Sequence, residues 1–267
     1  MTNIIQYRDV SDTTAGASPS IWGTCPWVEI GAQAAQGAGG VSFHDNFFMT
    51  SHVNGHLYQM LGDNTPVKVV DTLDGRIAVT TGGTDNDQSM MAATVDLAHI
   101  SDAAGEKQKL WFEARWKLNT ITDVGIFVGL AAEADVAVNF LADNTGDLVA
   151  TADAIGFHVL TATPTAVGTT YQKGSATKQA VETGVHTLVA DTYVKTGFIY
   201  DPSRDDDNQI TFFVNGAPQT TKVTATNIAT ATFPDSVNLT LMATAKTGEG
   251  TTKTVTMDWW RVAQLGA

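Results

Sequence analysis

The segment 110–118 has the clearest pattern of alternating apolar and polar positions in the chain. Every second residue from Leu110 to Leu118 is apolar, and apart from Trp111 the residues between them are charged. Side chains alternate between the two faces of a strand, so this pattern predicts a β-strand with one face on a core. Two-faced strands are typical of antiparallel sheets, whereas strands of parallel sheets are usually buried on both sides.

Six further apolar runs indicate that most of the chain is built from strands. They cover residues 125–130, 155–160, 194–200, 210–214, 237–243 and 255–262. We expect 125–130, which is nearly all apolar, to be an inner strand beside 110–118. Residues 136–141 are compatible with a helical turn.

Two turn signals define hairpins between these runs. The polar segment 201–208 contains proline, aspartate and asparagine, which favour turns, and it joins the strands on either side of it. Asn215 and Gly216 follow an apolar run, and this pair suits a type I′ turn, whose two central residues both need positive φ. A returning strand is therefore expected across 219–223.

The length and composition predict one large all-β domain. The chain has 267 residues, of which 43% are hydrophobic and 16% charged, so a large core can form. Residues 1–40 are rich in small and polar residues with isolated apolar positions. They are interpreted either as an extended N-terminal arm with anchors or as an edge strand with long loops. Residues 41–267 form the predicted sandwich domain.

The charge balance excludes some classes of partner. With 15 basic and 28 acidic residues, the formal net charge is -13. Phosphate backbones and anionic membranes attract clustered cations, so neither nucleic acid nor a membrane is an expected partner. Cys25 is the only cysteine, which excludes an internal disulfide, and a reducing cytoplasm suffices for folding. Residues 1–10 show neither a secretory signal nor a membrane anchor.

Candidate metal ligands are present without a convincing pattern. His44, His52 and His56 lie close together, but no glutamate lies between the last two as zinc hydrolase chemistry requires. We interpret them as loop histidines. The acidic segments 85–87 and 201–208 could supply calcium ligands, but their spacing fits solvated turns better. No metal or other cofactor is therefore expected.

Catalytic patterns are also missing from the sequence. Glycoside hydrolysis usually needs two carboxylates across a groove, and no Glu-x-Asp-x-x-Glu arrangement occurs. Glu113, on the charged side of its strand, is expected to pair with a cation on a neighbouring strand. There is no nucleophile elbow, phosphate-binding glycine loop or activated cysteine. We expect no catalytic residues and predict that the protein is not an enzyme.

Four tryptophans are the candidate binding residues. Trp259 and Trp260 are adjacent, so their rings lie on opposite faces of a strand and only one belongs to the core. The other is expected to lie under the N-terminal arm, to stack on a sugar or to fill an interface, and we favour the first. Trp22 and Trp27 are candidate anchors of the arm. With Trp111 and Trp259 they form the predicted binding set.

The chain resembles the concanavalin-like and laminin-G-like β-sandwich superfamily, in particular its members among virion proteins of tailed bacteriophages. The resemblance is carried in order by residues 43–47, 75–87, 110–115, 127–130, 156–158, 212–216 and 257–262. It implies a two-sheet antiparallel jelly roll with 257–262 as a late inner strand. The superfamily includes lectins and glucanases, but this chain lacks the paired glutamates of the glucanases and a convincing lectin metal site.

The resemblance implies binding or scaffolding rather than catalysis. Our leading hypothesis is a capsid decoration or cement protein, made in the host bacterial cytoplasm and incorporated into the virion. Its partner would be the major capsid protein, and we expect a homo-oligomer. The alternative is a tail or fibre protein that recognises host glycan through aromatic residues on the concave sheet. A degenerate glycoside hydrolase is a third hypothesis.

Overall fold

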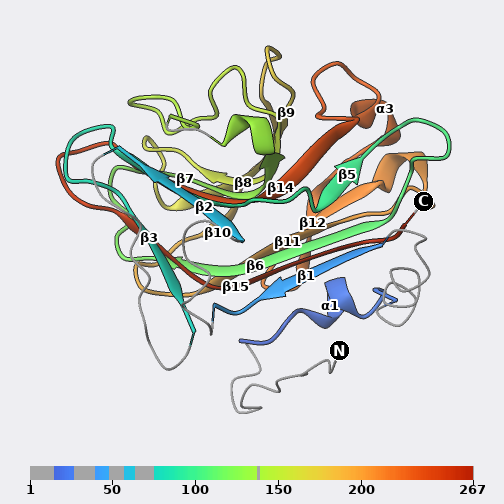
Figure 1. Cartoon of the computed structure of the whole chain (residues 1–267), viewed down its shortest axis with the longest axis horizontal. Helices are drawn as coiled ribbons and strands as arrows, with labels where there is room; N and C mark the ends of the chain where they lie inside the picture. Colours follow the sequence, from blue (N-terminus) through green and yellow to red (C-terminus); the bar gives the residue numbers. More distant parts are fainter. Residues whose placement is uncertain (1–14, 27–39, 48–56, 64–74, 137–138, 267) are drawn as a thin grey trace.

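The computed structural model of the chain describes residues 15–26, 40–47, 57–63, 75–136 and 139–266. Two antiparallel sheets pack face to face (Figure 1). We call them sheet I and sheet II. The order of sheet I is β1 (Val41–Asp45), β15 (Thr254–Gln264), β6 (Leu110–Leu118), β11 (Val194–Tyr200), β12 (Ile210–Val214) and β13 (Ala217–Val223), with β3 (Ile77–Thr80) also paired to β15.

Sheet II contains the remaining strands. Its order is β10 (Gln179–Thr187), β9 (Ala166–Gln172), β8 (Ala154–Val159), β7 (Val124–Ala132), β14 (Val237–Thr247), β4 (Gln88–Ala93) and β2 (Tyr58–Gly62), with β5 (Ala98–Ile100) also paired to β14. Helical structure in the described residues is limited to single turns. These are α1 (Pro19–Trp22), η2 (Glu133–Asp135), η3 (Asp206–Asn208) and α3 (Ala225–Ile228).

The predicted all-β, antiparallel two-sheet fold is confirmed, and each of the seven predicted apolar runs lies largely or wholly within a strand. The β12–β13 hairpin is also confirmed, with φ of 50° at Asn215 and 79° at Gly216. One expectation was wrong: β7 does not lie beside β6 but belongs to sheet II, where it pairs with β8 and β14. An apolar run shows that a strand faces the core, but not from which sheet.

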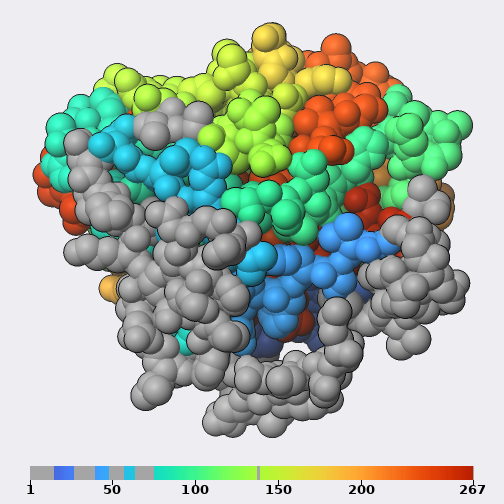
Figure 2. Space-filling model, in the orientation of Figure 1, coloured from blue at the N-terminus to red at the C-terminus, as the bar shows by residue number. Residues whose placement is uncertain are grey.

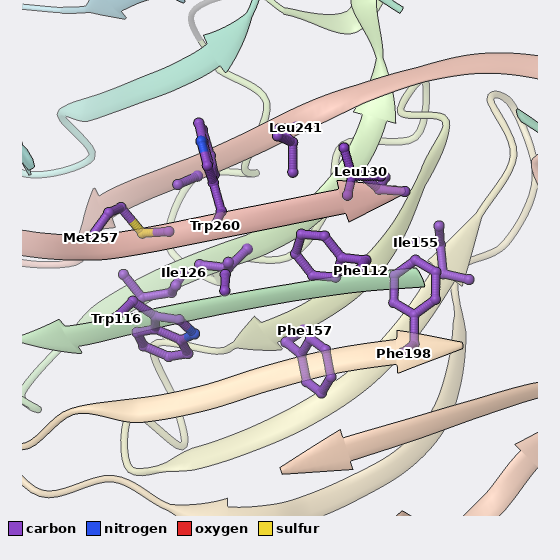
Figure 3. Close-up of a cluster of buried hydrophobic side chains, with 14 of the residues drawn as sticks. Phe112, Trp116, Ile126, Leu130, Ile155, Phe157, Phe198, Leu241, Met257 and Trp260 are labelled. Carbon is purple, nitrogen blue, oxygen red and sulfur yellow. The ribbon is translucent and has the colours of Figure 1, made fainter. Parts of the chain in front are cut away.

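The core fills the space between the two sheets. Alternate residues of β6 and β11 face alternate residues of β7, β8 and β14, as Figure 3 shows for Phe112, Phe198 and Phe157. The rings of Phe112 and Phe198 lie 5.3 Å apart between centroids. In the space-filling view, the cyan to green surface that includes β2, β4 and β5 lies directly above the blue surface of β1 (Figure 2).

Both outer faces of the sandwich are also covered by the chain. Residues between η2 and β8 pack on the outer face of sheet II, and residues around α1 pack on the outer face of sheet I. Figure 1 shows α1 below β6 and β15, on the side away from sheet II. Among the described residues, no helix has the length and apolar character needed to cross a membrane.

Candidate functional site

The outer face of sheet II is the concave face of the sandwich, because both sheets curve toward it in Figure 1. This face is packed with apolar side chains from the chain itself. Phe127 of β7 and Met242 of β14 form a cluster with Phe140, Leu141 and Leu148 from the covering segment. The rings of Phe127 and Phe140 lie 5.3 Å apart between centroids. Residues 139–152 therefore occupy the centre of the concave face.

A buried lysine fixes the covering segment in place. Lys246 of β14 is 1% exposed, and its Nζ lies 2.6 Å from Asp143 Oδ1. The same ammonium donates a 2.8 Å hydrogen bond to the carbonyl oxygen of Leu141, whose amide donates to Gln88 Oε1 at 2.8 Å. A buried cation needs such partners, so the segment and the sheet stabilise each other. Neither β7 nor β14 contains an aspartate or glutamate along its length.

The predicted binding tryptophans lie on the opposite, convex side of the molecule. Trp111 and Trp259 project from the outer face of sheet I and are 0% and 3% exposed. Residues 15–26 lie over them, with Trp259 Nε1 donating to the carbonyl oxygen of Ala15 at 2.8 Å. Our expectation of a sugar platform on the concave sheet does not hold for these two rings, because alternation along β6 and β15 directs them away from sheet II.

Only one of the two predicted N-terminal anchors, Trp22, lies within the described residues. Trp22 is 7% exposed and packs in one cluster with Trp111, Ile199 and Phe213 on sheet I. Trp27 lies outside the described residues, as do His52 and His56. The described tryptophans of the predicted set thus contact their own chain, and their contact with a partner stays a prediction.

Glu113 has the predicted cation opposite it, and further contacts that the sequence does not reveal. Arg261 of β15 is its partner in the strand register. Glu113 is 0% exposed, and its Oε2 accepts hydrogen bonds from Ser18 N at 3.0 Å and from Trp22 Nε1 at 2.7 Å. At Glu113 the charged face of β6 is thus covered, and the N-terminal segment supplies hydrogen bonds to Oε2 that water would otherwise provide.

Two of the remaining candidate metal ligands lie beside a cation of the protein itself. His44 lies on β1 directly across from the guanidinium-bearing Arg261, an unfavourable setting for a cation. Asp201 Oδ2 lies 2.6 Å from Lys109 Nζ, so this carboxylate is already paired with an ammonium. No cluster of three or more ligand side chains occurs within the described part of the chain.

Asp201 organises the loop between β11 and β12. Its Oδ1 accepts from Ser203 Oγ at 2.7 Å and from Ser203 N at 3.2 Å, which forms a tight turn. Burial alone raises the pKa of Asp201, but hydrogen bonds from Lys109 and Ser203 outweigh burial and hold it below its usual value. The loop then places Arg204 over β12, where its Nη1 donates to Thr211 Oγ1 at 3.1 Å.

This loop forms one wall of an open groove of about 650 Å³ on the convex side. The groove is bounded by α1, by the loop and η3, and by β12 and β13. Its lining residues are Ser20, Ser203, Arg204, Asp205, Asn208, Thr211, Phe213, Pro218 and Lys222. We call this feature the convex groove.

Two cations, the Asp205 carboxylate and several neutral polar groups give the convex groove its chemistry. Burial lowers the pKa of Lys222, and the nearby Arg204 guanidinium lowers it further while Glu182 opposes that effect. Arg204 donates to Thr211, which is the register partner of Lys222 across β12 and β13, so the two cations lie on the same side of the groove. Phe213 and Pro218 add apolar surface, and the hydroxyl and amide groups can donate and accept hydrogen bonds. The groove suits an anionic, hydroxylated ligand.

Sequence reasoning missed the convex groove for a physical reason. Its residues come from positions 20, 203–208 and 211–222, and only the packing of α1 on sheet I brings the first near the others. The loop 201–208 was interpreted as a solvated turn. The one signal in the sequence was that Arg204 and Lys222 lie on either side of the predicted strand 210–214 in a chain with few basic residues.

Comparisons with known proteins identify the fold. Peanut lectin superposes with a TM-score of 0.58 at 17% identity over 85% of this chain and 98% of the lectin. The carbohydrate recognition domain of Emp46p gives 0.58 at 10% identity over 82% and 94%. The Bacillus licheniformis β-glucanase gives 0.52 at 14% identity over 83% and 97%.

The fold is the concanavalin-like jelly roll. At these low identities the likeness concerns the fold alone. This jelly roll is shared by proteins named as lectins and by proteins named as glucanases, so it does not by itself distinguish binding from hydrolysis. No protein-family model matches the sequence, and the search of curated proteins found no match.

Proposed function

We propose that the protein is a non-catalytic glycan-binding protein whose convex groove receives an acidic saccharide. The observation that carries this proposal is the pair of cations, Arg204 and Lys222, beside hydroxyl groups and the apolar surface of Phe213. Sugars are bound by hydrogen bonds to their hydroxyls and by apolar contact with their C–H faces, and a sugar carboxylate adds charge-assisted hydrogen bonds to cations.

Two further observations support binding over hydrolysis. Peanut lectin and the Emp46p carbohydrate recognition domain share the jelly roll, and their names describe sugar binding. Hydrolysis by the usual mechanism uses two carboxylates placed across the scissile bond. The two central strands of the concave face, β7 and β14, carry none, and residues 139–152 cover that face.

The test is a glycan array followed by titration with one acidic oligosaccharide and its neutral counterpart. We expect binding of the acidic form only, with affinity that falls as salt increases. Arg204→Ala and Lys222→Ala should each weaken binding by about tenfold or more, as loss of a charge-assisted hydrogen bond implies. Lys107→Ala, at an exposed position that does not line the groove, is the matched control for charge. Equal binding by all three variants, or no bound glycan, would contradict the proposal.

A second candidate function is capsid decoration on a phage virion, favoured by the N-terminal segment that docks as a separate element on sheet I. In this role the protein is made in the bacterial cytoplasm and binds the major capsid protein. Purified protein should bind shells that lack it, and deletion of residues 1–40 should abolish that binding. Unchanged binding after the deletion would exclude a role for the segment.

A further inference from the structure

Residues 15–26, which we call the docking segment, form no ladder with sheet I. None of the described strands lies in this segment, and its only regular structure is the single turn α1. It is held by side chains that enter a site on the outer face of sheet I. This docking site is formed by Trp111, Glu113, Ile199, Phe213 and Ala263.

Two adjacent anchors supply the apolar part of this contact. Ile21 is 0% exposed and Trp22 is 7% exposed, although they lie in a short segment on the surface of the sandwich. A Cβ on Gly197 of β11 would lie 2.8 Å from Ile21 Cδ1, so the missing side chain there gives Ile21 its space. Buried aromatic and aliphatic anchors in fitted pockets are typical of interfaces between separate molecules.

The polar part of the contact is equally specific. Glu113 is fully buried, and its Oε2 accepts hydrogen bonds from Ser18 N and Trp22 Nε1, both from the docking segment. Trp111 Nε1 in turn donates to Thr24 Oγ1 at 3.2 Å. A buried carboxylate is costly without such donors. The docking site therefore recognises the docking segment through both shape and hydrogen bonds.

Contacts at the margins extend the recognition across several strands. Ser20 Oγ donates to the carbonyl oxygen of Gly216 at 2.6 Å, beyond β12. Lys195 Nζ of β11 donates to the carbonyl oxygen of Gly16 at 3.0 Å, and Trp259 of β15 donates to Ala15. The docking segment thus crosses sheet I from β15 to the β12–β13 turn. None of these contacts requires the segment and the site to belong to the same chain.

The connection to the sandwich is long enough to reach another molecule. Thirteen residues, 27–39, separate the docking segment from Gly40 and β1. A chain of that length spans at most about 45 Å when extended. Exchange of an identical element between copies preserves every contact and creates a closed, symmetric pair.

We propose that the docking segment binds the docking site of a second copy of this chain, which gives a homodimer by reciprocal exchange. Ser20 lines the convex groove, so in this dimer each groove is completed by a residue of the other copy. The proposal does not depend on glycan binding, because it concerns the contacts of residues 15–26 with sheet I and is measured without any sugar.

Complementation between two defective chains tests the exchange. Ile21→Glu disables the docking segment, and Ile199→Glu disables the docking site, while neither side chain faces the core between the sheets. We expect the wild type to have twice the mass of the 28.3 kDa chain by light scattering. Each variant alone should be monomeric. An equimolar mixture should give a one-to-one dimer, joined through the one intact segment and the one intact site.

A labelled peptide of residues 15–26 gives an independent measurement on the same site. It should bind the Ile21→Glu chain, and a peptide with Trp22→Ala should bind at least tenfold more weakly. A mixture that stays monomeric overturns the proposal, even if the peptide binds, because the site then serves its own chain only. A monomeric wild type overturns it as well, and that measurement does not depend on the folding of any variant.

Discussion

The indole Nε1 of Trp22 donates a 2.7 Å hydrogen bond to Oε2 of Glu113, across 91 positions of sequence. Both groups are buried on the outer face of sheet I. This contact joins the N-terminal segment to the middle of β6, where the alternation pattern alone places Glu113 in solvent. The covered face and the docked segment are therefore one structural feature.

Trp22→Phe tests the energetic value of this hydrogen bond. Phenylalanine keeps the apolar contact with Ile199 and Phe213 but has no N–H, so Glu113 Oε2 keeps only Ser18 N as a donor among the described residues. A hydrogen bond to a charged group contributes about 1.5–3 kcal/mol, and we expect a loss of that order in the free energy of unfolding. The measurement is urea denaturation followed by circular dichroism. If Trp22→Phe is as stable as the wild type, the hydrogen bond contributes nothing to the free energy of unfolding.

Cys25 provides a chemical probe of the docking segment. The thiol is 8% exposed, and burial raises its pKa to about 12, despite the opposing influence of Lys109. Only the thiolate reacts with iodoacetamide, so at pH 8 we expect alkylation at least about a hundredfold slower than for a free cysteine. Ile21→Glu, which displaces the segment, should restore the rate of a free thiol.

The control for this prediction is alkylation of the unfolded chain in urea, which gives the full rate for the same thiol. Mass spectrometry of the quenched reaction measures each rate. Fast alkylation of the folded wild type would contradict the burial of Cys25 between the docking segment and sheet I.

Phe140 tests the cover on the concave face. It is 1% exposed and packs against Phe127 with 5.3 Å between ring centroids. Replacing a buried phenylalanine by alanine typically costs about 3–5 kcal/mol, through lost burial and the cavity that remains. We expect Phe140→Ala to lower the free energy of unfolding by about that amount.

Val189→Ala is the matched control, because Val189 is an exposed apolar residue at 59% exposure. It should change stability by less than about 0.5 kcal/mol. Equal stability of the two variants in thermal and urea denaturation would show that residues 139–152 do not pack on sheet II in solution.

Local patterns predicted the strands that alternate clearly or end in distinctive turns. The alternation of 110–118 and the pair Asn215 and Gly216 were sufficient for β6 and for the β12–β13 hairpin. Two of the strands that were missed have weaker local signals. β4 (Gln88–Ala93) has no β-branched or aromatic residue, and β10 (Gln179–Thr187) has an interior glycine and a bulged register.

Long-range packing could not be predicted from those same patterns. The alternation showed which face of each strand lies on the core, but not to which sheet the strand belongs. For this reason β7 was placed beside β6. The charged outer face of β6 did not reveal that residues 15–26 cover it. The convex groove depends on that cover as well, since Ser20 reaches it only through the docking of Ile21 and Trp22.

His158 makes the stability of the fold depend on pH. It lies on the concave side of β8, is 5% exposed, and a Cβ on Gly168 would lie 2.8 Å from its Cε1. Burial lowers the pKa of His158 to about 4 from the ordinary value of 6.5, and the Lys178 ammonium lowers it further, while Asp147 opposes that effect. Between these two pH values the unfolded chain binds a proton at this residue and the folded chain does not. The contribution of neutral His158 to the free energy of unfolding is therefore fully present above pH 6.5. It is lost as the pH falls to about 4 and does not change further below that pH. The shift corresponds to about 3 kcal/mol.

We expect His158→Gln, which cannot titrate, to show a smaller loss of stability than the wild type between pH 8 and pH 4.5 in urea denaturation. Parallel pH profiles for the two proteins would mean that His158 is accessible to protons in the folded state.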